Sequence, residues 1–178
     1  MRLPITIALC LSLAAPAFAI DMPPRKAGLW ELTMDFGGRP LPATVMKHCI
    51  DAATDKLMNA QFGGAAQEAC SKQDVKNSGN TITVDSVCNF GDATTTSHAV
   101  MTGNFDSAYT VDVTSTREGG RPIPGQTPGA ATHMKIAAKY LGACEAGQKP
   151  GDIVMPNGMK MNVLELPKMG APPAPPKR

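Results

Sequence analysis

The chain has 178 residues, of which 43% are apolar, and its formal net charge is +2. This length is typical of a single domain, and the apolar content excludes wholesale disorder. The near-neutral charge excludes a polyanion binder that depends on bulk electrostatics, and an aromatic content of 4% leaves too few rings for a base-stacking surface. We therefore expect no nucleic-acid partner.

The N-terminus has the three parts of a secretory signal peptide. Arg2 gives a basic start, residues 5–15 are apolar, and Ala17-Phe18-Ala19 places small residues where signal peptidase requires them. The apolar run is too short to span a bilayer, and no other stretch of the sequence is long and apolar enough. We expect a soluble periplasmic protein that is cleaved after Ala19 and has no membrane span.

Short segments in which apolar and polar residues alternate predict a mainly β domain. In the first of them, Trp30, Leu32 and Met34 share one face. The expected strands are residues 29–36, 44–50, 70–77, 80–88, 94–102, 109–116 and 132–140. Their regular spacing favours antiparallel pairing.

One helix and a tail complete the predicted domain. Asp51 can cap a short helix over residues 51–60, which the Gly-Gly pair at 63–64 should end. Residues 166–178 are rich in proline and should form an extended, disordered tail. Residues 20–165 then form a single β-rich domain, an antiparallel meander or a small barrel-like curved sheet.

Four cysteines follow the signal peptide, and an even number in an oxidising compartment predicts two disulfides. The residues are Cys49, Cys70, Cys88 and Cys144, for which three connectivities exist. A two-residue turn in the predicted hairpin sets Cys70 opposite Val87, on the other face from Cys88. This register favours the pairs Cys49–Cys70 and Cys88–Cys144.

Several of these segments resemble a bacterial family, the domain of unknown function 3617. They are KAGLWE at 26–31, HCID at 48–51, CSKQDV at 70–75, VDSVC at 84–88, MTGNF at 101–105 and KPGD at 149–152. The resemblance covers about residues 24–162. It implies an exported protein of Gram-negative bacteria, and it supplies no catalytic residues because the family has none assigned.

The sequence gives little sign of catalytic chemistry. His48, His98 and His133 fall on separate predicted strands without a recognisable partner, which indicates partly exposed strand histidines. The acidic residues fall mostly on outward strand faces, as on a solvated surface. We expect no catalytic residues and no cofactor, and an unrecognised hydrolase is one alternative.

A cluster of methionines suggests Cu(I) handling as another alternative function. Met155, Met159 and Met161 cluster near the end of the domain, and thioether sulfur is a good ligand for Cu(I). Methionine also fills irregular gaps in a core. The absence of a nearby histidine favours packing over copper handling.

Two loops have related sequences, with GGRPLP at 37–42 and GGRPIP at 119–124. Their arginines, Arg39 and Arg121, could form one anion site if the loops met. A simple meander would place the loops at opposite ends of the sheet, which favours two independent turns.

The inward-facing positions of the predicted strands form one apolar stripe, which lines either a filled core or a ligand cavity. It consists of Trp30, Met34, Val84, Val111, Met134 and Tyr140. The leading hypothesis is a non-enzymatic periplasmic domain whose candidate partner is a small apolar molecule or a periplasmic protein.

Overall fold

A computed structural model of the protein describes residues 22–37, 42–123 and 126–165, except for the side chains of residues 60–68. The predicted signal peptide and the proline-rich tail lie outside the described residues.

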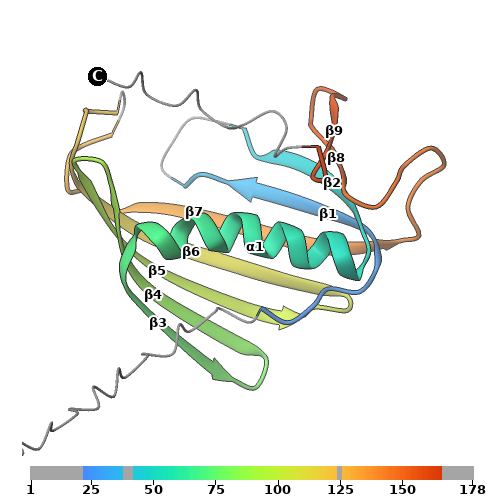
Figure 1. Ribbon diagram of the computed structural model, residues 1–178, viewed down its shortest axis with the longest axis horizontal. Coiled ribbons are helices and arrows are strands. Elements are labelled where there is room, and N and C mark those ends of the chain that lie inside the picture. The colour runs from blue at the N-terminus through green and yellow to red at the C-terminus, as the bar shows by residue number, and fades with distance from the viewer. Residues whose placement is uncertain (1–21, 38–41, 124–125, 166–178) are drawn as a thin grey trace, which may run out of the picture.

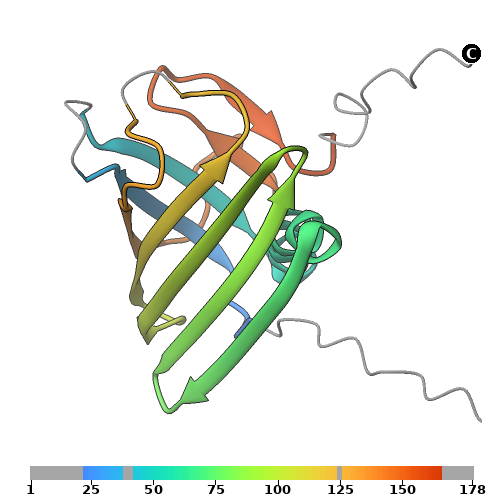
Figure 2. The same cartoon turned by 90° about the vertical axis from the view of Figure 1, so that its left-hand side faces the viewer.

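In the described part of the chain, nine strands form a single antiparallel sheet in the order β3-β4-β5-β6-β7-β1-β2-β8-β9. The strands are β1 (Gly28–Asp35), β2 (Thr44–Ile50), β3 (Cys70–Ser78), β4 (Thr81–Phe90), β5 (Ala93–Asn104), β6 (Ala108–Gly119), β7 (Thr132–Gly142), β8 (Asp152–Val154) and β9 (Lys160–Asn162). The mainly β, antiparallel prediction is confirmed. The described sheet is strongly curved but not closed, because β3 and β9 are its edges (Figures 1 and 2).

The helix α1 (Ala52–Ala69) carries the chain across the sheet, from β2 near one edge to β3 at the other (Figure 1). Asp51 caps it, because the Asp51 carboxylate accepts a hydrogen bond of 2.8 Å from the Thr54 amide. The Thr54 hydroxyl in turn accepts from the Asp51 amide at 2.9 Å, which completes a capping box. The pKa of Asp51 is lowered chiefly by the hydrogen bonds that its carboxylate accepts from the Thr54 amide and from the Thr54 hydroxyl, the latter at 2.7 Å.

The predicted end of the helix is wrong. Gly63 and Gly64 lie within α1, which continues to Ala69. A glycine in a helix costs about 1 kcal/mol relative to alanine, so the composition alone favours an earlier end. The connection from β2 to β3 has to cross the sheet, and this tertiary requirement outweighs the local preference.

Two apolar clusters occupy the concave side of the sheet. The Trp30 cluster consists of Trp30, Leu32, Ile50, Met58, Ala138, Ile153 and Val163. The Ile82 cluster consists of Ile82, Val84 and Met101, against which Met22 and Phe105 pack. Met58 brings the N-terminal half of α1 onto the Trp30 cluster, so that part of the interior is filled.

The predicted disulfide connectivity is wrong, although all four cysteines are bridged. The structure joins Cys49 to Cys144 and Cys70 to Cys88. Cys49 lies on β2 and is fully buried, and its bridge fastens the segment after β7 to this strand.

Two local features of the hairpin between β3 and β4 explain the error. The turn residues are Gly79 and Asn80, since Ser78 pairs with Thr81, and the pairing is therefore displaced along the strands. A β-bulge between Cys70 and Lys72 then shifts the register by one residue and sets Cys70 opposite Cys88. A one-residue shift exchanges the two faces of a strand, so the parity argument fails at this cysteine.

Candidate functional site

The predicted inward stripe divides between the two ends of the concave side. Trp30 is fully buried, and Tyr140 packs against it with ring centroids 5.6 Å apart. Val84 is buried in the Ile82 cluster and Val111 packs against that cluster, whereas Met34 and Met134 are half-buried. The Trp30 end is therefore filled core, and the Ile82 end adjoins an open pocket.

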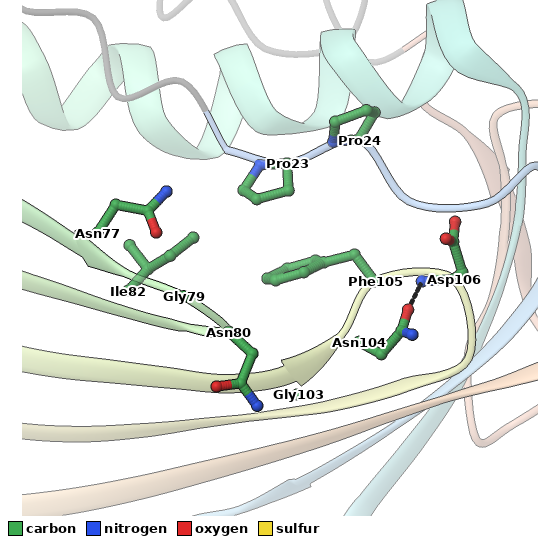
Figure 3. A pocket seen from close by; sticks show the side chains of 10 residues that line it. All are labelled: Pro23, Pro24, Asn77, Gly79, Asn80, Ile82, Gly103, Asn104, Phe105 and Asp106. Carbon is green, nitrogen blue, oxygen red and sulfur yellow. Dashed lines mark hydrogen bonds between the residues drawn. The ribbon is translucent and has the colours of Figure 1, made fainter.

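This pocket, which we call the rim pocket, has a volume of about 630 Å³. It lies between the segment before β1, the β3–β4 turn and the β5–β6 turn (Figure 3). The Phe105 ring extends into the space below Pro23. Its lining residues are Pro23, Pro24, Asn77, Gly79, Asn80, Ile82, Gly103, Asn104, Phe105 and Asp106.

The two turns that line the rim pocket are joined to each other. The Gly103 amide donates to the Asn80 carbonyl at 3.1 Å. Gly103 has a φ of 136°, and a Cβ at this position would lie 2.5 Å from the Ala108 carbonyl oxygen. Only glycine allows this close approach of backbones, so the shape of the rim depends on Gly103.

The third wall is fixed by a buried ion pair. The Arg25 side chain is 7% exposed and that of Asp55, in the first turn of α1, is 1% exposed. The Arg25 amide donates to Asp55 Oδ2 at 2.9 Å and Arg25 Nε donates to Asp55 Oδ1 at 2.8 Å. The Lys26 amide donates to the Phe105 carbonyl at 3.1 Å. These contacts hold Pro23 and Pro24 over the Ile82 cluster.

His48 is buried beside this ion pair, which corrects the prediction of a partly exposed histidine. It lies on β2 opposite Trp30 and is 6% exposed. Among the described residues, neither of its ring nitrogens has a hydrogen-bond partner. Burial, and secondarily the positive charge of Arg25, lowers the pKa of His48 to about 4. His48 is therefore neutral at pH 7 and belongs to the core.

The other two histidines lie on the exposed convex face. His98 Nδ1 is 2.7 Å from Asp85 Oδ1, and this hydrogen bond is the main cause of the lowered pKa of Asp85. His133 Nδ1 is 3.1 Å from the Thr114 hydroxyl. Neither histidine lines the rim pocket.

Two acidic residues are exceptions to the expectation that these residues lie mostly on solvated faces. Asp55 and Asp152 are buried, with exposed fractions of 1% and 5%. Asp55 is missed because the residue that compensates its charge, Arg25, lies 30 residues earlier in the sequence. The alternation of Met46, His48 and Ile50 on one face was the available signal for the burial of His48.

The three methionines considered for copper have different surroundings. Met155 and Met161 pack against the Trp30 cluster, whereas Met159 is 53% exposed. Within the described ranges, no group of three or more His, Cys, Asp or Glu side chains is arranged to hold a metal ion. Within the same ranges, no helix has both the length and the apolar character needed to cross a membrane.

Residues 25–144 match the sequence profile described as "Protein of unknown function (DUF3617)". The chain belongs to the DUF3617 family. The matched region of this DUF3617 protein runs from Arg25 to Cys144 and so includes the buried ion pair, both disulfides and most of the rim pocket. No curated protein and no solved structure matches the chain significantly.

Proposed function

We propose that this DUF3617 protein is an exported, periplasmic binding protein that holds a small molecule with an apolar body in the rim pocket. The observation that carries the proposal is the pocket itself, whose volume of about 630 Å³ lies in the range of small-molecule sites. The signal-like N-terminus supports the export.

The lining of the rim pocket supports this class of ligand. Phe105, Ile82 and Pro23 supply apolar surface, and Ile82 continues into the buried Ile82 cluster. The side chains of Asn77, Asn80 and Asn104 add amide groups to the lining, although Asn104 Oδ1 already accepts from the Asp106 amide at 2.7 Å (Figure 3). An apolar body with one hydrogen-bonding edge matches this combination, because apolar burial supplies affinity and a few polar groups fix orientation.

The experiment is native mass spectrometry of the protein isolated from the periplasm of its own host. Phe105→Ser removes the ring from the rim pocket, and Phe90→Ser removes an aromatic ring that is 54% exposed and does not line it. We expect the wild type and Phe90→Ser to carry an additional organic mass and Phe105→Ser to lose most of it. A wild-type protein that carries no additional mass contradicts the proposal, and so does equal retention by all three proteins.

A further inference from the structure

A second, smaller pocket lies at the other end of β6 from the rim pocket. Tyr109 is the second residue of this strand and stacks on Phe105, and Arg117 lies near the far end of the strand. The second pocket has a volume of about 240 Å³, and we call it the hood pocket because described residues of the β6–β7 loop, within 120–123 and 126–130, bound it. Its lining residues are Thr95, Ser115, Arg117, Gly119, Gly120, Pro122, Ile123, Gln126, Thr127, Pro128, Ala130 and Thr132.

Arg117 is the charged residue of the hood pocket. Its side chain leaves β6 on the same face as Ser115, and its Nη1 donates to the Arg121 carbonyl at 3.0 Å. No carboxylate among the described residues lies within ion-pair distance of Arg117, and the pocket lining contains no Asp or Glu. A half-buried guanidinium without a counter-ion favours an anionic ligand.

Hydroxyl groups surround this guanidinium. Thr95 lies directly opposite Arg117 on the neighbouring strand. Ser115 and Thr132 are paired across β6 and β7, with their hydroxyl oxygens 3.0 Å apart. The Thr132 hydroxyl also donates to the Ser115 carbonyl at 3.1 Å, so the hydrogens of this pair are engaged and a ligand's hydroxyls can donate to the lone pairs of the two oxygens.

Two glycines of the β6–β7 loop, Gly120 and Gly129, lie close to Arg117. Gly120 has a φ of 68°, and a Cβ at this position would lie 2.4 Å from Arg117 Nη2. The Gly129 amide donates to the Arg117 carbonyl at 3.1 Å, which returns the loop to the strand. A side chain at residue 120 would therefore displace the guanidinium from its place under the loop.

We propose that the hood pocket binds a small oxyanion, namely a carboxylate carried on a hydroxylated carbon chain. The guanidinium pairs with the carboxylate, and Thr95, Ser115 and Thr132 bind the ligand's hydroxyls. The volume of about 240 Å³ admits a short chain of this kind. Phosphate shares the charge and the acceptor oxygens, so it should compete for Arg117.

The hood pocket is a different site from the one that Arg39 and Arg121 could form if their loops met, which was the alternative to the two independent turns that the sequence favours. Arg121 is exposed, and Arg39 lies outside the described residues. The two loops do follow strands that run in the same direction, because β1 and β6 both pair antiparallel with β7. The crossing by α1 produces this arrangement, which a simple meander would not.

The experiment is an NMR titration of the full mature protein with sodium gluconate at an ionic strength held constant with sodium chloride. Glucose serves as the neutral probe, and sodium phosphate as the competing oxyanion. We expect saturable shifts of the Arg117 side-chain N–H and of the Ser115 and Thr132 amides with gluconate, and none with glucose. Phosphate should reverse the gluconate shifts.

The variants separate the hood pocket from general attraction to a cation. Arg117→Gln and Gly120→Ala should each weaken gluconate binding at least tenfold, whereas Arg121→Gln, which changes an exposed arginine of the same loop, should alter it less than twofold. Equal binding by folded Arg117→Gln overturns the proposal. If Arg117→Gln fails to fold, wild-type shifts that fall outside the hood pocket overturn it instead, as does a response to phosphate without one to gluconate.

Discussion

Arg25 and Asp55 form an ion pair that is almost completely shielded from water and joins the segment before β1 to the first turn of α1. The carboxylate accepts hydrogen bonds from both the backbone and the side chain of Arg25, so each charge is compensated by geometry as well as by proximity. The amide of the next residue, Lys26, donates a hydrogen bond to the Phe105 carbonyl in the rim pocket. The buried ion pair and the wall of the rim pocket therefore depend on the same short segment before β1.

Removal of one charge of this pair should destabilise the fold strongly. We expect Asp55→Ala to lower the free energy of unfolding by about 3–5 kcal/mol, because it leaves a buried, uncompensated guanidinium. The matched control is Asp112→Ala, which breaks an exposed pair with Lys135 at 3.7 Å and should cost less than about 1 kcal/mol. Urea unfolding measures both, and similar losses for the two variants would contradict a buried anchor.

The burial of His48 predicts a specific loss of stability in mild acid. Its pKa is lowered from 6.5 to about 4 in the folded protein, so below pH 6.5 the unfolded chain takes up a proton more readily than the folded one. Stability is therefore complete above pH 6.5 and is lost as the pH falls toward 4, by roughly 2–3 kcal/mol at pH 4.5.

Two measurements check this prediction. The ring protons of His48 should titrate with a midpoint near 4 in an NMR experiment, and His48→Gln should reduce the loss of stability between pH 7 and pH 4.5. A midpoint near 6.5, or an identical pH dependence in the variant, would show that this imidazole is accessible to water.

The two disulfides should contribute unequally. Cys49 and Cys144 are separated by 95 residues, and Cys70 and Cys88 by 18. Chain-entropy arguments then give about 4.7 kcal/mol for the first bridge and about 3 kcal/mol for the second. Replacing each pair by alanine and measuring urea unfolding tests this order. Non-reducing peptide mapping tests the pairing itself, which a Cys49–Cys70 peptide would refute.

If the protein is exported, its mature N-terminus should lie directly after the signal peptide. If signal peptidase cuts after Ala19, the mature chain begins at Ile20, two residues before Met22, which packs against the Ile82 cluster. N-terminal sequencing of protein from the periplasmic fraction should begin Ile-Asp-Met-Pro. An intact Met1 in the cytoplasmic fraction would contradict the predicted export.

Alternation along the sequence identified most of the strands from β1 to β7. The exception is β3, which has no buried residue and was predicted from its place in a hairpin with β4. Alternation could not identify β8 and β9, which have three residues each and are too short to show a period. A different limit applies to α1. Its glycines predict an early end of the helix, which the path of the chain across the sheet does not permit.

The errors arise from contacts and backbone irregularities that the apolar pattern of the sequence does not show. The sequence around Asp55 is that of an ordinary capped helix, and only the approach of Arg25, 30 residues earlier, explains why a carboxylate is buried there. The bulge at the start of β3 similarly reverses the parity from which the disulfides were predicted. The apolar stripe was identified from the sequence, but its division into filled core and rim pocket depends on how α1 and the segment before β1 cover the sheet.

Titration with the neutral fluorescent probe N-phenyl-1-naphthylamine tests the rim pocket most directly, because this probe has no charge for Arg117 to attract. Saturable binding is expected for the wild type and for Phe90→Ser, with binding at least about tenfold weaker for Phe105→Ser, as the loss of one apolar side chain from a pocket implies. Unsaturable fluorescence, or equal affinities for the three proteins, would show that the rim pocket does not bind apolar molecules.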